Sequence, residues 1–222
     1  MDGGVGLFTS ELKKLKTKLD SLNDEQKQIN HIRTLISSKK KLQYDIFKDA
    51  GVNAKIMKQA GAEAKNLKLG GYTLKELISA DYKIADLKLA RFSANQLKDE
   101  GVDAEKLKKV GFSIIELKKA NFTISELREA GFTISDLKLG GFSANEFRNA
   151  GLSAEDLYLA EFTKAELKKA GFRVNDLLEI KSIQPEALRI LYNDPESLRL
   201  INNAIKELVD RKNEGPPITP YF

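Results

Sequence analysis

Large apolar side chains recur along the middle of the chain with a period of ten residues. Each ten-residue repeat holds two of them, five positions apart, between residues that are mostly polar or small. Aligned on Gly51, the chain contains thirteen repeats and the last one ends at Ile180. A fixed period predicts a stacked architecture, in which each repeat buries its apolar side against neighbouring repeats.

We number the positions of a repeat from 1 to 10, with Gly51 at position 1. Position 2 is usually aromatic and position 7 is almost always Leu, as in Phe122 and Leu127. Position 4 holds a small or branched apolar residue, with Lys164 as the exception. The apolar positions 2, 4 and 7 therefore predict the core.

The polar positions predict a short helix of about eight residues. Thr123 can cap a helix start by accepting from a backbone N–H, and Glu126, three residues later, can accept from the Thr123 N–H. Phe122 and Leu127 have the spacing of a hydrophobic staple across this cap. Gly131 then ends the helix, because glycine adopts the left-handed conformation at low cost.

The same capping pair recurs at positions 3 and 6 of most repeats. Glu63, Lys83 and Arg173 occupy position 3 without being good caps, so the helix boundaries there are less well defined. The other pairs, some with the shorter Asp, are Thr73/Glu76, Ser93/Gln96, Ser113/Glu116, Thr133/Asp136, Ser143/Glu146, Ser153/Asp156 and Thr163/Glu166.

The alternative fold is a right-handed β-helix of the pentapeptide type, because Phe and Leu alternate every five residues. In that coil the residue two before the central Leu points inward and must be small, whereas this chain has residues such as Lys75 and Glu105 there. A buried charge without a partner is costly. We therefore predict an all-α solenoid of short helices, capped by helices at both ends.

Residues 1–50 form the predicted N-terminal cap. Their apolar residues repeat with alternating spacings of three and four, which predicts an amphipathic, coiled-coil-like helix or a broken pair; Gln26 and Arg33 occupy two positions of this seam. Packing on the first repeat is the favoured role, and self-association through residues 12–36, with Leu15 and Leu22, is the alternative. The seam residues are Leu12, Leu15, Leu19, Leu22, Ile29 and Ile36.

After Ile180 the period ends, and residues 181–212 form the predicted C-terminal helical cap. The run Asp194-Pro195-Glu196 predicts the start of a helix that ends near Lys212. Residues 213–222 are rich in proline and cannot form regular structure. Their apolar residues are candidate partner-binding residues, namely Ile218, Tyr221 and Phe222.

A basic residue occupies position 8 in most repeats, and stacking turns such a position into a stripe. The macrodipole of each helix favours bases near its end, so the favoured role is structural. The alternative is a module that binds nucleic acid or another polyanion. The net charge of +5, from 37 basic and 32 acidic residues, is thin and spread along the chain, and does not favour it. Candidate residues are Lys88, Lys98, Lys108, Lys118, Arg128, Lys138 and Arg148.

Residues that could carry catalysis are scarce. The chain has no cysteine and one histidine, His31, and it contains no Walker-type phosphate loop, no dinucleotide fingerprint and no zinc-protease motif. We therefore expect no enzymatic activity, no cofactor and no metal. No signal peptide or membrane-spanning segment is apparent, which predicts an intracellular, cytoplasmic protein.

The repeat AGF[ST]xx[DE]L[KR]x resembles the decapeptide repeats in proteins of protists, algae and large DNA viruses. The resemblance covers residues 51–180 and carries no catalytic or binding residue with it. Because the chain offers no catalytic group, we predict a structural or adaptor protein that mediates contacts between proteins in a larger assembly. A virion or another scaffold is the context that the resemblance suggests.

Overall fold

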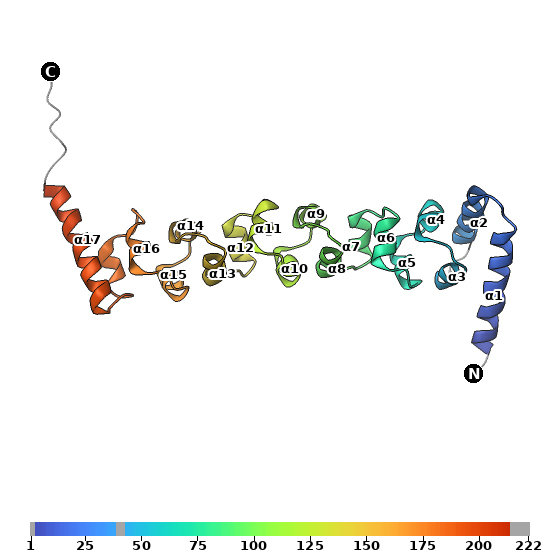
Figure 1. Ribbon diagram of the computed structural model, residues 1–222, viewed down its shortest axis with the longest axis horizontal. Helices are drawn as coiled ribbons and strands as arrows, with labels where there is room; N and C mark the ends of the chain where they lie inside the picture. Colours follow the sequence, from blue (N-terminus) through green and yellow to red (C-terminus); the bar gives the residue numbers. More distant parts are fainter. Residues whose placement is uncertain (1–2, 39–42, 214–222) are drawn as a thin grey trace, which may run out of the picture. The chain divides into compact units, whose positions relative to one another are not determined.

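The computed structural model describes residues 3–38 and 43–213, in which it contains helices and no strands. It confirms the predicted all-α repeat fold, and the alternative β-helix is wrong. The chain forms two compact units, Met1–Phe122 and Thr123–Phe222. Figure 1 shows the short helices following one another within each unit.

The first unit contains two longer helices followed by a series of short ones. These are α1 (Gly3–Asp20), α2 (Glu25–Ser38), α3 (Asp45–Asp49), α4 (Ala54–Gln59), α5 (Ala64–Leu69), α6 (Leu74–Ser79), α7 (Ile84–Leu89), α8 (Ala94–Asp99), α9 (Ala104–Lys109) and α10 (Ile114–Lys119).

The second unit begins with short helices and ends with a long one. These are α11 (Ile124–Glu129), α12 (Ile134–Leu139), α13 (Ala144–Asn149), α14 (Ala154–Leu159), α15 (Lys164–Lys169), α16 (Val174–Leu178), the 3-10 helix η1 (Pro185–Leu188) and α17 (Pro195–Asn213).

The predicted capping box is present at the start of α11. The Glu126 N–H donates to Thr123 Oγ1 at 3.1 Å, and the Thr123 N–H donates to Glu126 Oε2 at 2.6 Å. The helix has six residues, fewer than the predicted eight. It ends early because Gly131 has a φ of 79° and the Phe132 N–H returns to the carbonyl of Leu127 at 3.1 Å, which closes a Schellman motif.

Four repeats make the same left-handed turn without glycine. Asp81, Arg91, Asn121 and Glu161 occupy position 1 with φ between 57° and 65°. This conformation is unfavourable for side chains larger than glycine. The packing on both sides of these turns therefore holds them in place at a cost in free energy.

Within each unit, several short helices pack on the helix two repeats away. Within the first unit α5 contacts α7, α4 contacts α6 and α8 contacts α10, and within the second unit α13 contacts α15 and α14 contacts α16. The Tyr72 hydroxyl marks the same spacing, because it donates to the carbonyl of Val52, twenty residues earlier, at 2.7 Å. Two repeats therefore make one layer, and α13 and α14 also touch α14 and α15, their successors in sequence.

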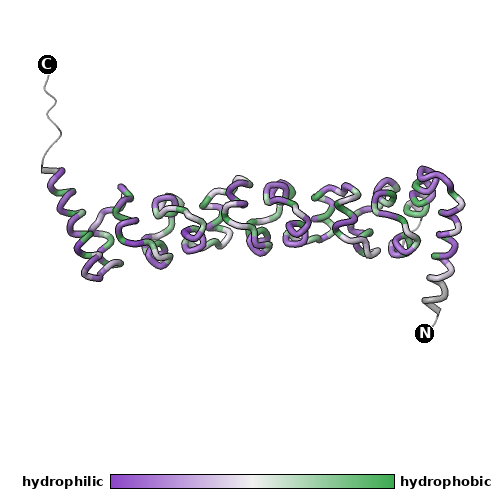
Figure 2. Tube along the Cα trace, in the orientation of Figure 1, coloured by the Kyte–Doolittle hydropathy of each residue, from purple (hydrophilic) through white to green (hydrophobic). Residues whose placement is uncertain are grey.

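The core of each stack is apolar, as positions 2, 4 and 7 predict. Figure 2 shows hydrophobic segments toward the middle of each stack and hydrophilic helix turns outside. Position 7 is the most completely buried, with no exposed surface at Met57, Leu67, Leu77, Leu87, Leu97, Leu107, Leu117, Leu127, Leu137, Phe147, Leu157, Leu167 and Leu177.

Helices α1 and α2 cover the beginning of the stack. Helix α1 packs on α3 and α2 packs on α4, so each continues one of the two alternating rows. The predicted seam residues Leu15 and Ile29 are buried within the chain. Ile32, which is not one of the predicted seam residues, is buried as well. Arg33, expected at the seam, is exposed and donates to the carbonyl of Gln59 at 2.8 Å, because the break between the two helices resets the helical phase.

The repeating contacts extend beyond the repeating sequence at both ends. Before the first repeat, Lys48 Nζ donates to the carbonyl of Gly71 at 2.5 Å, as position-8 cations do later in the chain. After the last repeat, the Tyr192 hydroxyl donates to the carbonyl of Phe172 at 2.7 Å. Helix α17 then packs on α16 and η1, and it starts at the predicted Pro195.

Candidate functional site

The position-8 cations connect layers of the stack. Lys98 Nζ donates to the carbonyl of Asn121 at 2.6 Å and lies 4.2 Å from the ring centroid of Phe122. Lys138 Nζ makes the equivalent contacts, 2.7 Å to the carbonyl of Glu161 and 4.5 Å to the ring of Phe162. Each cation thus satisfies a carbonyl at the end of a helix two repeats later, and also makes a cation–π contact.

This arrangement makes the role of the predicted basic stripe more specific. Lys88 and Arg148 also reach carbonyls two repeats later, those of Val110 at 3.0 Å and Ala170 at 3.4 Å. The favoured interpretation placed each base on the dipole of its own helix, whereas these cations serve a different helix. The remaining polyanion candidates, Lys108, Lys118 and Arg128, occupy the same position of their repeats.

The position-6 acids are also used within the chain. Backbone N–H donation from the cap residue lowers the pKa of Glu116 and of Glu166, with the Ser113 and Thr163 hydroxyls adding to the effect. The Ser153 hydroxyl is the largest cause of the lowered pKa of Asp156. In a repeat that matches the consensus, the conspicuous polar side chains therefore stabilise the helix.

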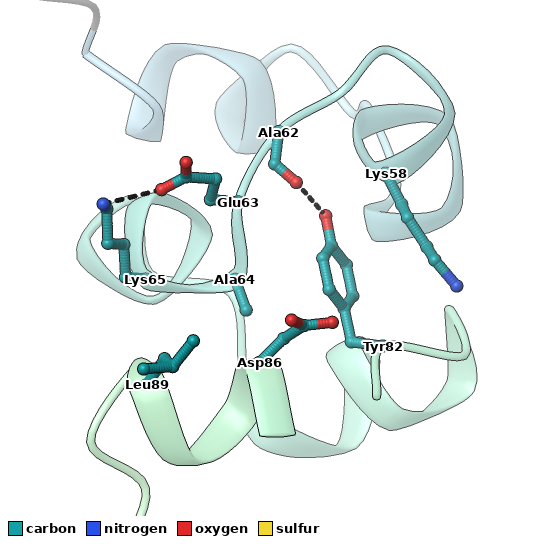
Figure 3. Close-up of a pocket in the computed structure, with 8 residues that line it drawn as sticks. All are labelled: Lys58, Ala62, Glu63, Ala64, Lys65, Tyr82, Asp86 and Leu89. Carbon is teal, nitrogen blue, oxygen red and sulfur yellow. Dashed lines mark hydrogen bonds and ion pairs between the residues drawn. The ribbon is translucent and has the colours of Figure 1, made fainter. Parts of the chain in front are cut away.

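At one place in the first unit, polar side chains surround a pocket. A pocket of about 530 Å³ opens between α4, α5 and α7, and we call it the Tyr82 hollow (Figure 3). It has an apolar floor and a charged rim, and is lined by Lys58, Ala62, Glu63, Ala64, Lys65, Tyr82, Asp86 and Leu89.

Tyr82 forms one wall of this hollow. Its hydroxyl donates to the carbonyl of Ala62 at 2.7 Å, and burial, aided by the charge of Asp86, raises the pKa of the Tyr82 hydroxyl. Lys58 Nζ lies 5.5 Å from the ring centroid and donates to the carbonyl of Asp81 at 2.6 Å. The ring is thereby fixed with one side available to the hollow.

The second unit has a hollow at the equivalent place. Seven of its eight lining residues come from the same repeat positions, with Ile180 at position 10 as the exception, and its volume is about 330 Å³. At position 2 of the earlier repeat the buried Leu152 stands where the first unit has Ala62, and it does not line the smaller hollow. A larger side chain at this position is consistent with the smaller volume. We call it the Phe172 hollow, lined by Arg148, Ser153, Ala154, Glu155, Phe172, Asp176, Glu179 and Ile180.

A row of exposed leucines adjoins the Tyr82 hollow. Leu69 and Leu89 both occupy position 9, on the stacked helices α5 and α7, and are 85% and 77% exposed. Leu139 and Leu159, also two repeats apart, are 86% and 74% exposed in the second unit. These four leucines were not predicted from the sequence, although leucine at an otherwise polar position is a visible signal.

The candidate partner-binding residues are not brought together. Leu15 is buried and Leu22 is half-buried in the N-terminal cap, while Ile218, Tyr221 and Phe222 lie outside the described residues. Within residues 3–38 and 43–213, no group of three or more potential ligands could hold a metal ion. In the same ranges no helix has the length and apolar character needed to cross a bilayer.

Comparisons with known proteins give one match. The family model for the decapeptide repeat region matches residues 51–124 and 111–183, which together make up more than half of the chain. Neither the curated proteins nor the solved structures contain a significant match. The matched residues include both hollows and the four exposed leucines.

Proposed function

The chain belongs to the decapeptide repeat family, and we propose that it is a non-enzymatic structural or adaptor protein that binds protein partners through the outer faces of its repeats. The exposed leucines carry this proposal. One exposed leucine is ordinary on a protein surface. Leu69 and Leu89, however, repeat at one position of two stacked helices, and contiguous apolar surface typically marks a protein contact.

The proposal extends to a larger assembly. A repeat whose consensus residues are used for its own stability can vary its outer positions without losing the fold. Such a stack suits a scaffold, and the resemblance to repeats of large DNA viruses makes a virion one such assembly. We propose an intracellular setting on the same grounds.

Photo-crosslinking tests the proposal. A photoreactive amino acid replaces Leu89 or Leu159 in the protein expressed in its own host, with Lys75 and Asn145, exposed positions of the same units, as controls. We expect discrete adducts with other proteins from the leucine positions and none from the controls. The same adducts from all four positions, or no adducts, would contradict the proposal.

Binding of a polyanion is the second candidate, because the position-8 cations form a repeated basic feature. A polyanion would have to compete with the carbonyl groups that Lys88 and Lys98 already contact. Binding measured over a salt series distinguishes the two candidates, since contacts to phosphates release counterions and give a steep salt dependence. We expect no binding to nucleic acid at low salt.

A further inference from the structure

We infer that the Tyr82 hollow receives an arginine or lysine side chain that projects from an apolar helical segment of a protein partner. This inference rests on the proposed function and specifies which surface binds and what chemistry it selects. The hollow itself, its single unpartnered carboxylate and the leucines beside it carry the argument.

The carboxylate is that of Asp86, at position 6 of its repeat. In neighbouring repeats the residue at this position accepts from the N-cap backbone, as Glu76 does from the Thr73 N–H at 2.6 Å. The N-cap of α7 is Lys83, whose side chain makes no capping bond. Within the described part of the chain, the Asp86 side chain has no hydrogen-bond or ion-pair partner.

The other charges around the hollow are already paired. Lys65 Nζ lies 2.7 Å from Glu63 Oε2, and Lys58 Nζ lies 3.7 Å from Asp81 Oδ2. In Figure 3 Asp86 lies between Ala64 and the Tyr82 ring, while Lys58 lies on the other side of that ring. The hollow therefore presents one uncompensated negative charge to an incoming group.

The floor favours a ligand that is apolar along most of its length. Ala62 and Ala64 are buried, and Tyr82 contributes the wall of its ring. The side chains of lysine and arginine combine an apolar stem with a charged end, so they can cover such a floor and still reach Asp86. An acidic or purely apolar group would bury the Asp86 carboxylate without a partner, which costs free energy.

The leucine row extends this surface beyond the hollow. Leu89 lines the hollow, and Leu69 occupies the same position on the helix packed beside it. Packed helices lie roughly 8–10 Å apart, and residues seven apart on one face of a helix are separated by about 10 Å. Two apolar residues of a partner helix can therefore contact the two leucines while a basic residue of that helix enters the hollow.

The Phe172 hollow provides a comparison within the same chain. Its position-6 acid, Asp176, accepts from the Arg173 N–H at 2.6 Å, and Glu179 replaces the leucine at position 9. It is smaller, its acid is partnered and it lacks the apolar contact. We expect it to bind no such segment.

Selection of peptides on the full chain tests the inference. A library of random sixteen-residue peptides is displayed and selected for binding, and the recovered peptides are then measured by fluorescence anisotropy. We expect arginine or lysine between apolar residues to be enriched. Asp86→Asn should weaken binding by tenfold or more, Ala62→Leu should abolish it, and the control Asp99→Asn on α8 should leave it unchanged.

Three results would overturn the inference: no selected peptide, enrichment without basic residues, or binding unchanged by Asp86→Asn. Circular dichroism shows whether Ala62→Leu folds, and the nearly isosteric Asp86→Asn decides the matter if it does not. The proposed function is tested separately, because adducts from Leu159 would support it even if the Tyr82 hollow bound nothing. Absence of adducts at every leucine would instead reject the proposed function.

Discussion

The Tyr82 hollow and the Phe172 hollow occupy the same place in the repeat, but of their lining positions only Ala64/Ala154 and Asp86/Asp176 carry the same residue. The first has Ala62, Lys83 and Leu89 where the second has Leu152, Arg173 and Glu179. The larger space and the leucine at the rim accompany these changes. Lys83 and Arg173 both lack a side-chain capping bond, yet Asp176 accepts from the backbone N–H of its cap residue and Asp86 does not. Consensus residues thus build the stack, and departures from the consensus create a surface that can select a partner.

The largest effect should come from exchanging the residues that set the volumes. Leu152 is 7% exposed, and Leu152→Ala should lower the free energy of unfolding by about 2 to 5 kcal/mol because it leaves a cavity in the core. Urea unfolding followed by circular dichroism measures this loss. A loss below about 0.5 kcal/mol would show that Leu152 does not fill the Phe172 hollow.

The turns that precede the two hollows also differ. Gly171 has a φ of 88°, and a Cβ there would lie 3.1 Å from Arg148, so Gly171→Asp should cost about 1 to 2 kcal/mol. Asp81 makes the corresponding turn with a φ of 65°, and Asp81→Gly should stabilise the chain by up to about 1 kcal/mol. Thermal melting of both variants checks the opposite signs. Stabilisation by Gly171→Asp would contradict the account.

Installing the missing cap should make the two hollows more alike. In Lys83→Thr, position 3 could cap α7 and Asp86 could accept from its N–H, as in the neighbouring repeats. We expect a gain of about 1 kcal/mol in the free energy of unfolding, together with weaker binding of the selected peptides. If Lys83→Thr stabilised the chain but left peptide binding unchanged, the missing cap would have no influence on the binding site.

Lowering the pH should remove the stability that the capping carboxylates contribute to their repeats. The pKa of Asp156 is lowered mainly by the Ser153 hydroxyl. A lowered pKa in the folded state contributes stability above the unfolded value, about 4, and this contribution disappears as the pH falls through the folded value. The melting temperature should therefore fall below about pH 4, and less steeply in Ser153→Ala. Identical pH profiles would contradict this role of the cap.

Much of the helical structure could be predicted from local sequence. The pair Thr123 and Glu126 fixes the start of a helix and Gly131 fixes its end, because capping depends on residues within one repeat. The absence of a good cap at Lys83 was visible in the same way. The first half of the N-terminal seam was also predictable from the sequence. Ile32 was not predicted, because the turn between α1 and α2 shifts the helical phase of the apolar positions.

The packing partners could not be predicted from the repeat. Every repeat presents nearly the same positions, so the sequence does not say whether a helix packs on the next repeat or on the one after it. The contacts of Lys98 and the Tyr82 hollow both depend on that choice. Ala62 was recognisable as an atypical residue, but its consequence appears only when Tyr82 is placed beside it.

Intramolecular crosslinking tests the packing of alternate repeats most directly. The chain has no cysteine, so pairs can be introduced at position 9 without background. We predict that a short bismaleimide joins Leu69→Cys to Leu89→Cys efficiently and joins Leu69→Cys to Ser79→Cys poorly. Peptide masses after proteolysis identify the joined pair. Faster crosslinking of the pair at 69 and 79 would mean that successive repeats pack together, and would contradict the account.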